Sequence, residues 1–124
     1  MAMSATNEPV FDWAQASSLL GDNPNEVDPD MAAIAVELVT SADAQFAELR
    51  KLNPETERKT ISSQAHGLRG CLLNFGFTEV GGVLLEVEKG PYESSEYLGK
   101  INQAEAVFQA SKKLLGERYP ALGL

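Results

Sequence analysis

The 124-residue sequence has little of the two side chains that most often mark metal and redox sites: one cysteine, Cys71, and one histidine, His66. A single cysteine cannot form an intramolecular disulfide, and one Cys with one His cannot supply the four ligands of a structural zinc site. We therefore expect neither a metal ion nor another cofactor. A hydrolase of the Ser/His or Cys/His type would have to use His66.

Basic residues are also scarce. Ten Lys and Arg stand against 18 Asp and Glu, giving a net charge of −8, so the chain lacks the cationic surplus that neutralises nucleic-acid phosphates. No run approaches the roughly 18–20 consecutive apolar residues of a membrane helix. The polar start has neither the basic end nor the apolar run of a signal peptide. We predict a cytoplasmic protein that binds neither nucleic acid nor membrane.

The sequence does contain enough apolar residues for a core, 44% of the total, and they recur at the spacings of three and four that are typical of amphipathic helices. Residues 1–9 are predicted to form a flexible tail, and residues 10–124 a single helical domain. Proline, glycine and asparagine divide this domain into five predicted helices, at approximately 11–20, 28–52, 54–75, 79–89 and 94–119.

The predicted fold is all-α. Four amphipathic helices with short connections predict an antiparallel four-helix bundle, with the short first helix lying across one end or side. Asp28 before Pro29 is predicted to cap the second helix, Gly76 to follow the end of the third, and Thr78 to cap the fourth. The predicted core-facing residues of the second and third helices are Met31, Ala35, Leu38, Ala42, Phe46, Leu49, Ile61, Ala65, Leu68, Leu72 and Phe75.

The histidine lies on the predicted helix 54–75. Each helical residue advances about 100°, so with Ile61 at zero the core-facing residues fall within about 40° and His66 falls near 140°. His66 is thus predicted to point outward, on one face with Arg69, Gly70 and Leu73. By the same arithmetic Cys71 and Leu72 lie toward the core, where we interpret both as packing residues.

Two interpretations of this outward histidine are open. It is either an ordinary solvated side chain or a reactive one. Gly67 and Gly70 each cost about 1 kcal/mol relative to alanine inside a helix, which indicates a need for space beside the imidazole. Arg69, one turn away, carries a guanidinium suited to phosphoryl oxygens. A Ser62–His66 couple is a further alternative, but it lacks an orienting acid on that face.

The segment from Ala65 to Gly70 resembles the A-H-x-L-K-G signature of histidine phosphotransfer (HPt) domains. Asn74 and Gly76 fall at the family's N-x-G positions, and the stretch Glu86–Glu88 falls where the family places its acidic E-L-E. The helical pattern is similar over roughly residues 28–115. One residue differs from the signature: Arg69 stands where the family has lysine. A planar guanidinium therefore replaces a compact ammonium group.

The resemblance implies an HPt bundle that acts as a phosphocarrier in a two-component phosphorelay and is not itself an enzyme. His66 is then the phosphoryl acceptor and donor, Arg69 stabilises phosphoryl charge, and Gly70 leaves steric room. The partners are response-regulator receiver domains or a hybrid sensor kinase, with Mg²⁺ and the aspartate belonging to the receiver. Ser62 and Leu73 are the expected docking residues, and a monomer is expected.

Two other kinds of protein remain as alternatives: a helical adaptor that binds a receiver or kinase without taking phosphate, and a detached module of a hybrid kinase. The adjacent Gly81 and Gly82 are interpreted as a place where the fourth helix packs closely on the third, because two glycines inside a helix otherwise carry a cost.

Overall fold

The computed structural model describes residues 9–124, and within them all regular structure is helical. The elements are α1 (Trp13–Leu20), α2 (Pro29–Lys51), α3 (Arg58–Asn74), α4 (Thr78–Lys89), α5 (Ser94–Arg118) and a short 3-10 helix, η2 (Pro120–Leu122). The predicted all-α class and the short first helix are confirmed for these residues. The predicted tail, apart from Pro9, lies outside the described residues. None of the described helices is both long and apolar enough to cross a membrane.

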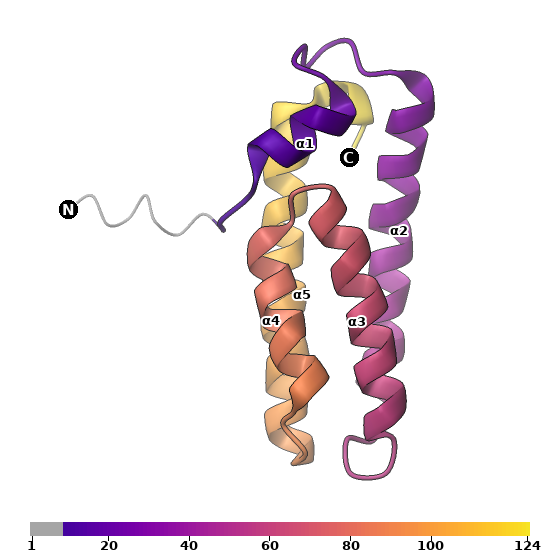
Figure 1. The fold of residues 1–124 in the computed structure, drawn as a ribbon, viewed down its shortest axis with the longest axis vertical. Helices are drawn as coiled ribbons and strands as arrows, with labels where there is room; N and C mark the ends of the chain where they lie inside the picture. The colour runs from indigo at the N-terminus through magenta and orange to yellow at the C-terminus, as the bar shows by residue number, and fades with distance from the viewer. Residues whose placement is uncertain (1–8) are drawn as a thin grey trace, which may run out of the picture.

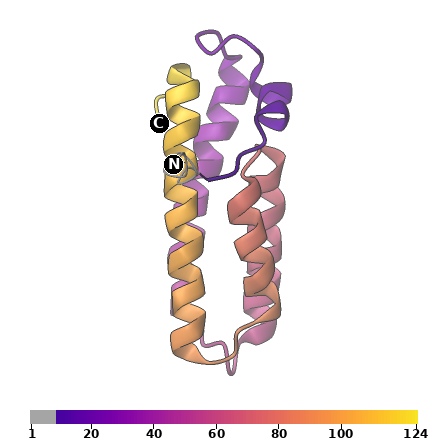
Figure 2. The same cartoon turned by 90° about the vertical axis from the view of Figure 1, so that its left-hand side faces the viewer.

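The four longer helices lie alongside one another and alternate in direction (Figure 1). Helix α3 contacts α4, α4 contacts α5, and α2 contacts both α3 and α5. The α2 and α5 helices extend past the turn between α3 and α4, and α1 lies across that turn (Figures 1 and 2).

Backbone and side-chain hydrogen bonds hold α1 on that turn. The side chain of Asp12 accepts from the backbone of Gln15 and so caps α1. The Asp12 backbone N–H donates to the Gly76 carbonyl at 2.8 Å, and the Gln15 amide donates to the Asn74 carbonyl at 2.9 Å. The first helix is therefore fixed to the loop that joins α3 to α4.

The start of α3 differs from the prediction. The helix begins at Arg58 and not at Pro54. The Glu57 backbone N–H donates to the Asn53 carbonyl at 2.7 Å, while the Asn53 N–H donates to Glu57 Oε1 at 2.8 Å. The Asn53 side chain also accepts from the Glu55 N–H at 2.9 Å. These bonds close a turn over residues 53–57, because an Asn side chain bonded to nearby backbone offers the chain an alternative to the helix.

Other boundaries agree more closely. Asp28 caps α2 as predicted, accepting from the backbone of Asp30 at 2.8 Å. The prediction that Thr78 caps α4 is wrong: Thr78 is the first residue of the helix, and its hydroxyl donates to the Gly76 carbonyl at 3.2 Å. The first helix begins at Trp13, two residues later than predicted, because Asp12 is its cap.

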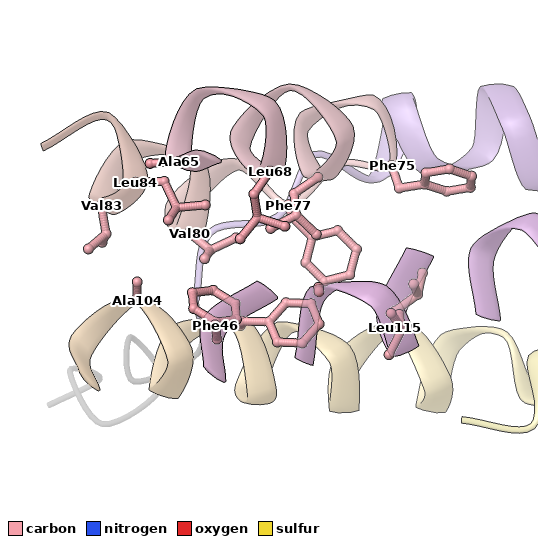
Figure 3. Packing of buried hydrophobic residues seen from close by; sticks show 14 of the residues in the cluster. Phe46, Ala65, Leu68, Phe75, Phe77, Val80, Val83, Leu84, Ala104 and Leu115 are labelled. Carbon is pink, nitrogen blue, oxygen red and sulfur yellow. The ribbon is translucent and has the colours of Figure 1, made fainter. Parts of the chain in front are cut away.

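A chain of aromatic rings crosses the core and joins α2, α5, the α3–α4 turn and the segment before α1. The ring centroids of Phe77 and Phe108 lie 5.5 Å apart, as do those of Phe46 and Phe108, and Phe11 lies 5.0 Å from Phe77. Side chains from α3 and α4 point toward those from α2 and α5 (Figure 3). The predicted core positions of α3 are buried, and α4 and α5 bury apolar faces against them. In α2, Val39 is buried where Met31 and Leu38 are only partly so.

Tyr97 contributes a pH-dependent part of the stability. Its buried hydroxyl donates to the Leu49 carbonyl, and burial, aided by the charge of Glu57 and opposed by that of Arg58, raises the pKa of Tyr97 to about 12. Because this folded-state pKa exceeds the unfolded value, the contribution is complete below pH ~10 and is lost as pH rises toward 12. In urea unfolding, we expect about 2 kcal/mol to disappear across that window.

The Tyr97→Phe variant is the control for this pH dependence. We expect it to cost about 1 kcal/mol at neutral pH, since the Leu49 carbonyl loses the tyrosine hydroxyl and keeps only the 3.3 Å hydrogen bond from the Leu52 N–H. Its unfolding free energy should fall less steeply than that of the parent between pH ~10 and 12. Parallel curves for the two proteins would contradict the assignment.

Candidate functional site

His66 lies midway along α3, on the side of the helix opposite the core. Ile61, Ala65, Leu68 and Leu72 are completely buried, whereas the His66 side chain is 70% exposed. The outward position predicted from helical phase is therefore confirmed.

Glu88 of α4 brings a carboxylate to this histidine. Its Oε1 lies 3.1 Å from His66 Nδ1, and its Oε2 lies 2.6 Å from Arg69 Nε. The Arg69 Nη2 is 3.4 Å from the same Nδ1. His66, Arg69 and Glu88 thus form one cluster, which we call the histidine cluster, built from two neighbouring helices.

Gly81 allows α3 and α4 to approach closely enough for this cluster to form. A Cβ at Gly81 would lie 2.7 Å from Leu73 Cδ2 and 3.7 Å from Arg69 Cγ. This confirms the close packing expected at Gly81. The close packing expected at Gly82 is not found, because a Cβ added there would meet nothing within 4 Å among the described residues.

The two contacts of Nδ1 make opposite demands on the imidazole. A carboxylate oxygen only accepts hydrogen bonds, so the 3.1 Å contact with Glu88 Oε1 requires a proton on Nδ1, whereas a guanidinium only donates, so the 3.4 Å contact with Arg69 Nη2 would require a lone pair there. The shorter contact, to a charged acceptor, favours the proton on Nδ1. The neutral ring then carries its lone pair on Nε2. Since the His66 side chain is largely exposed, this nitrogen is available as a nucleophile to a partner in solution.

Glu88 is held in its charged form. Partial burial alone would raise its pKa, but the hydrogen bonds from Arg69 and His66, together with the positive charge of Arg69, outweigh burial and lower the pKa of Glu88 below its ordinary value. A charged acceptor makes both of its hydrogen bonds stronger than neutral ones.

The other predicted site residues lie around the cluster. Gly70 is exposed, and a Cβ there would meet nothing within 4 Å; the same is true of Gly67. Among residues 9–124, no packing contact explains either glycine. Leu73 is 36% exposed and Ser62 is half-buried. Within the described chain, no hydrogen bond joins Ser62 to His66.

The packing role predicted for Cys71 is wrong. Cys71 is exposed, whereas its neighbour Leu72 is fully buried as predicted. Cys71 borders a shallow hollow of about 380 Å³ between α2 and α3, together with Ile34 and Leu38. By phase Cys71 stands about 80° from Ile61, at the margin of the core-facing side, where α2 leaves it uncovered.

Sequence reasoning missed Glu88 as a site residue and placed no acid beside His66. The periodicity of α4 held a usable signal, since Gly81, Leu85 and Glu88 recur at spacings of four and three on one face. Using it requires knowing which face of α4 meets α3. Among residues 9–124, no group of three or more His, Cys, Asp or Glu is placed to hold a metal ion.

No family model matches this chain, and comparisons with curated proteins and with solved structures likewise give no match. The histidine cluster itself is therefore the guide to function. Its chemistry is that of an exposed nitrogen nucleophile, oriented by a carboxylate, with a guanidinium beside it and open space over two glycines.

Proposed function

We propose that this chain is a histidine phosphotransfer protein of the HPt type, an antiparallel four-helix bundle with an extra N-terminal helix, which carries a phosphoryl group on His66. The observation that carries the proposal is the His66 side chain, 70% exposed, with Nδ1 engaged by Glu88 so that Nε2 is left for a partner. The resemblance of residues 65–70 to the HPt signature supports it independently.

The donor in this proposal is a phospho-aspartate on a response-regulator receiver domain. The Nε2 lone pair of His66 attacks phosphorus, the bond between phosphorus and the aspartyl oxygen breaks, and its electron pair leaves with the aspartate carboxylate. The reverse sequence passes the group to a second receiver. The receiver contributes the aspartate and its Mg²⁺, and this chain contributes the nitrogen and its surroundings.

Arg69 supplies positive charge beside the reacting group. Glu88 engages only its Nε, so the two terminal nitrogens keep donors for phosphoryl oxygens. The arginine in place of the family lysine therefore retains its proposed role while being anchored to α4. Such a fixed donor requires little reorganisation as charge develops in the transition state.

Gly67 and Gly70 leave the surface beside the imidazole open. Two glycines inside one helix cost about 1 kcal/mol each relative to alanine, and no close contact in the described part of the chain requires either glycine. In this proposal that open surface admits the aspartate pocket of the receiver to within bonding distance of Nε2. Leu73 and Ser62 lie beside it as the proposed docking residues.

The test is to find where the phosphoryl group resides. The chain is incubated with a panel of receiver domains carrying phosphorus-32 on their aspartates, and the labelled peptide is identified by mass spectrometry. We expect a label on His66 that is stable in base and lost in acid. Stable binding to receivers without any label would contradict the proposal and favour the adaptor instead.

A further inference from the structure

Glu88 contacts both polar side chains of the histidine cluster at the same time. Its side chain is only 13% exposed, and it uses separate oxygens, Oε1 for His66 Nδ1 and Oε2 for Arg69 Nε. The two contacts do not compete with each other. The arginine therefore holds the carboxylate in place while the carboxylate accepts the hydrogen bond from the Nδ1–H of His66.

We propose that Glu88 keeps the proton on His66 Nδ1 after Nε2 has been phosphorylated, and thereby keeps the phosphoryl group ready to leave. This inference rests on the proposed function. When Nε2 uses its lone pair to bond phosphorus, Nδ1 still holds its proton and the ring becomes positively charged. The Glu88 carboxylate, 3.1 Å from Nδ1, stabilises that charge.

The ring proton matters when the nitrogen–phosphorus bond breaks. The electron pair of that bond returns to Nε2. If Nδ1 is protonated, the ring leaves as neutral imidazole; if Nδ1 has lost its proton, the ring has to leave as an anion, which is a far poorer leaving group. A group that retains the Nδ1 proton therefore speeds departure of the phosphoryl group to any acceptor, water included.

Arg69 of α3 acts against this effect, and Glu88 of α4 offsets it. The Arg69 Nη2 lies 3.4 Å from Nδ1 and disfavours a second positive charge on the ring. The 2.6 Å contact of Glu88 with Arg69 Nε places a negative charge between the two cations. Glu88 is thus a positioning residue, acting through the imidazole and not on phosphorus.

The experiment uses phosphoramidate, a small phosphoryl donor that releases ammonia and needs no receiver. Wild type and Glu88→Gln are phosphorylated on His66, the donor is removed, and phosphorus NMR follows hydrolysis at neutral pH. We expect hydrolysis about tenfold slower in Glu88→Gln, because the hydrogen bond from Nδ1–H is stronger to a charged acceptor than to a neutral one. A tenfold change corresponds to about 1.4 kcal/mol. Rates that agree within about twofold would overturn the inference.

Glu86→Gln is the matched control. It removes the same charge from the same helix, but Glu86 pairs with Lys100 of α5 and is not part of the histidine cluster. We expect its phosphohistidine to hydrolyse at the wild-type rate. Equal slowing in the two variants would show a general charge effect and would overturn the role assigned to Glu88.

Nitrogen-15 NMR of the unmodified protein gives a readout that does not depend on any variant folding. We expect neutral His66 to carry its proton on Nδ1, and a proton on Nε2 would refute the inference. Neither measurement uses a receiver, so the role of Glu88 and the proposed phosphotransfer from receivers can be refuted independently. A chain that shows these results but accepts nothing from receivers refutes the proposed function while leaving the role of Glu88 intact.

Discussion

The His66→Gln variant should lose phosphoryl transfer from receivers by at least about a thousandfold, because glutamine offers no nucleophilic nitrogen. The fold should be almost unaffected. The His66 side chain is 70% exposed and contacts Glu88 at the surface, so we expect its unfolding free energy to change by no more than about 0.5 kcal/mol. Transfer is measured as label on the chain at early times, and stability by urea unfolding.

The informative control for this variant is Ser62→Ala. Ser62 stands one turn before His66 and is the nucleophile of the alternative hydrolase. If His66 is the phosphoryl carrier, Ser62→Ala retains transfer within a few fold. Label that persists in His66→Gln but disappears in Ser62→Ala would reverse the assignment of the acceptor.

The Gly76→Ala variant should produce the largest loss of stability, about 3 kcal/mol or more. Gly76 follows α3 with a φ of +95°, and its N–H and that of Phe77 bond back to Leu73 and Leu72 in the pattern of a Schellman motif. An alanine Cβ in that conformation would be strained. It would also lie 2.8 Å from Phe11 Cε1 and even nearer the Asp12 carbonyl oxygen.

Gly82→Ala is the matched comparison for Gly76→Ala. Gly82 lies inside α4, and an added Cβ there would meet nothing within 4 Å. The same substitution should therefore stabilise the chain by about 0.8 kcal/mol, the helical preference of alanine over glycine. Urea unfolding of both variants measures the two opposite shifts. A Gly76→Ala protein as stable as wild type would contradict the account of the α3–α4 turn.

The outward position of His66 could be predicted because it depends on one helix alone. Counting 100° per residue from Ile61 fixes the face on which His66 lies, whatever the helix packs against. The same count failed for Cys71, since a residue at the margin of the core-facing side is buried or exposed according to how far the next helix reaches. That distance depends on α2 and is not encoded in α3.

Glu88 could not be placed for a related reason. Its contact with His66 joins residues 22 positions apart, and it depends on the register in which two helices pack. That register is set by the close approach at Gly81, where the size of Leu73 decides the fit. The prediction that α3 begins at Pro54 was wrong for a local reason. Hydrogen bonds between Asn53 and Glu57 stabilise a turn in place of the first helical turn.

The placement of α1 also determines the order in which the chain can fold. Its partners lie far along the sequence: Val10 bonds Glu79, and the carbonyl of Gly21, just after α1, accepts from the Tyr119 hydroxyl. On the ribosome α1 is synthesised before any of these residues. Helix α1 and its flanking residues therefore cannot complete these contacts until Tyr119 has been made, and Phe11 cannot pack against Phe77 until the α3–α4 turn has emerged.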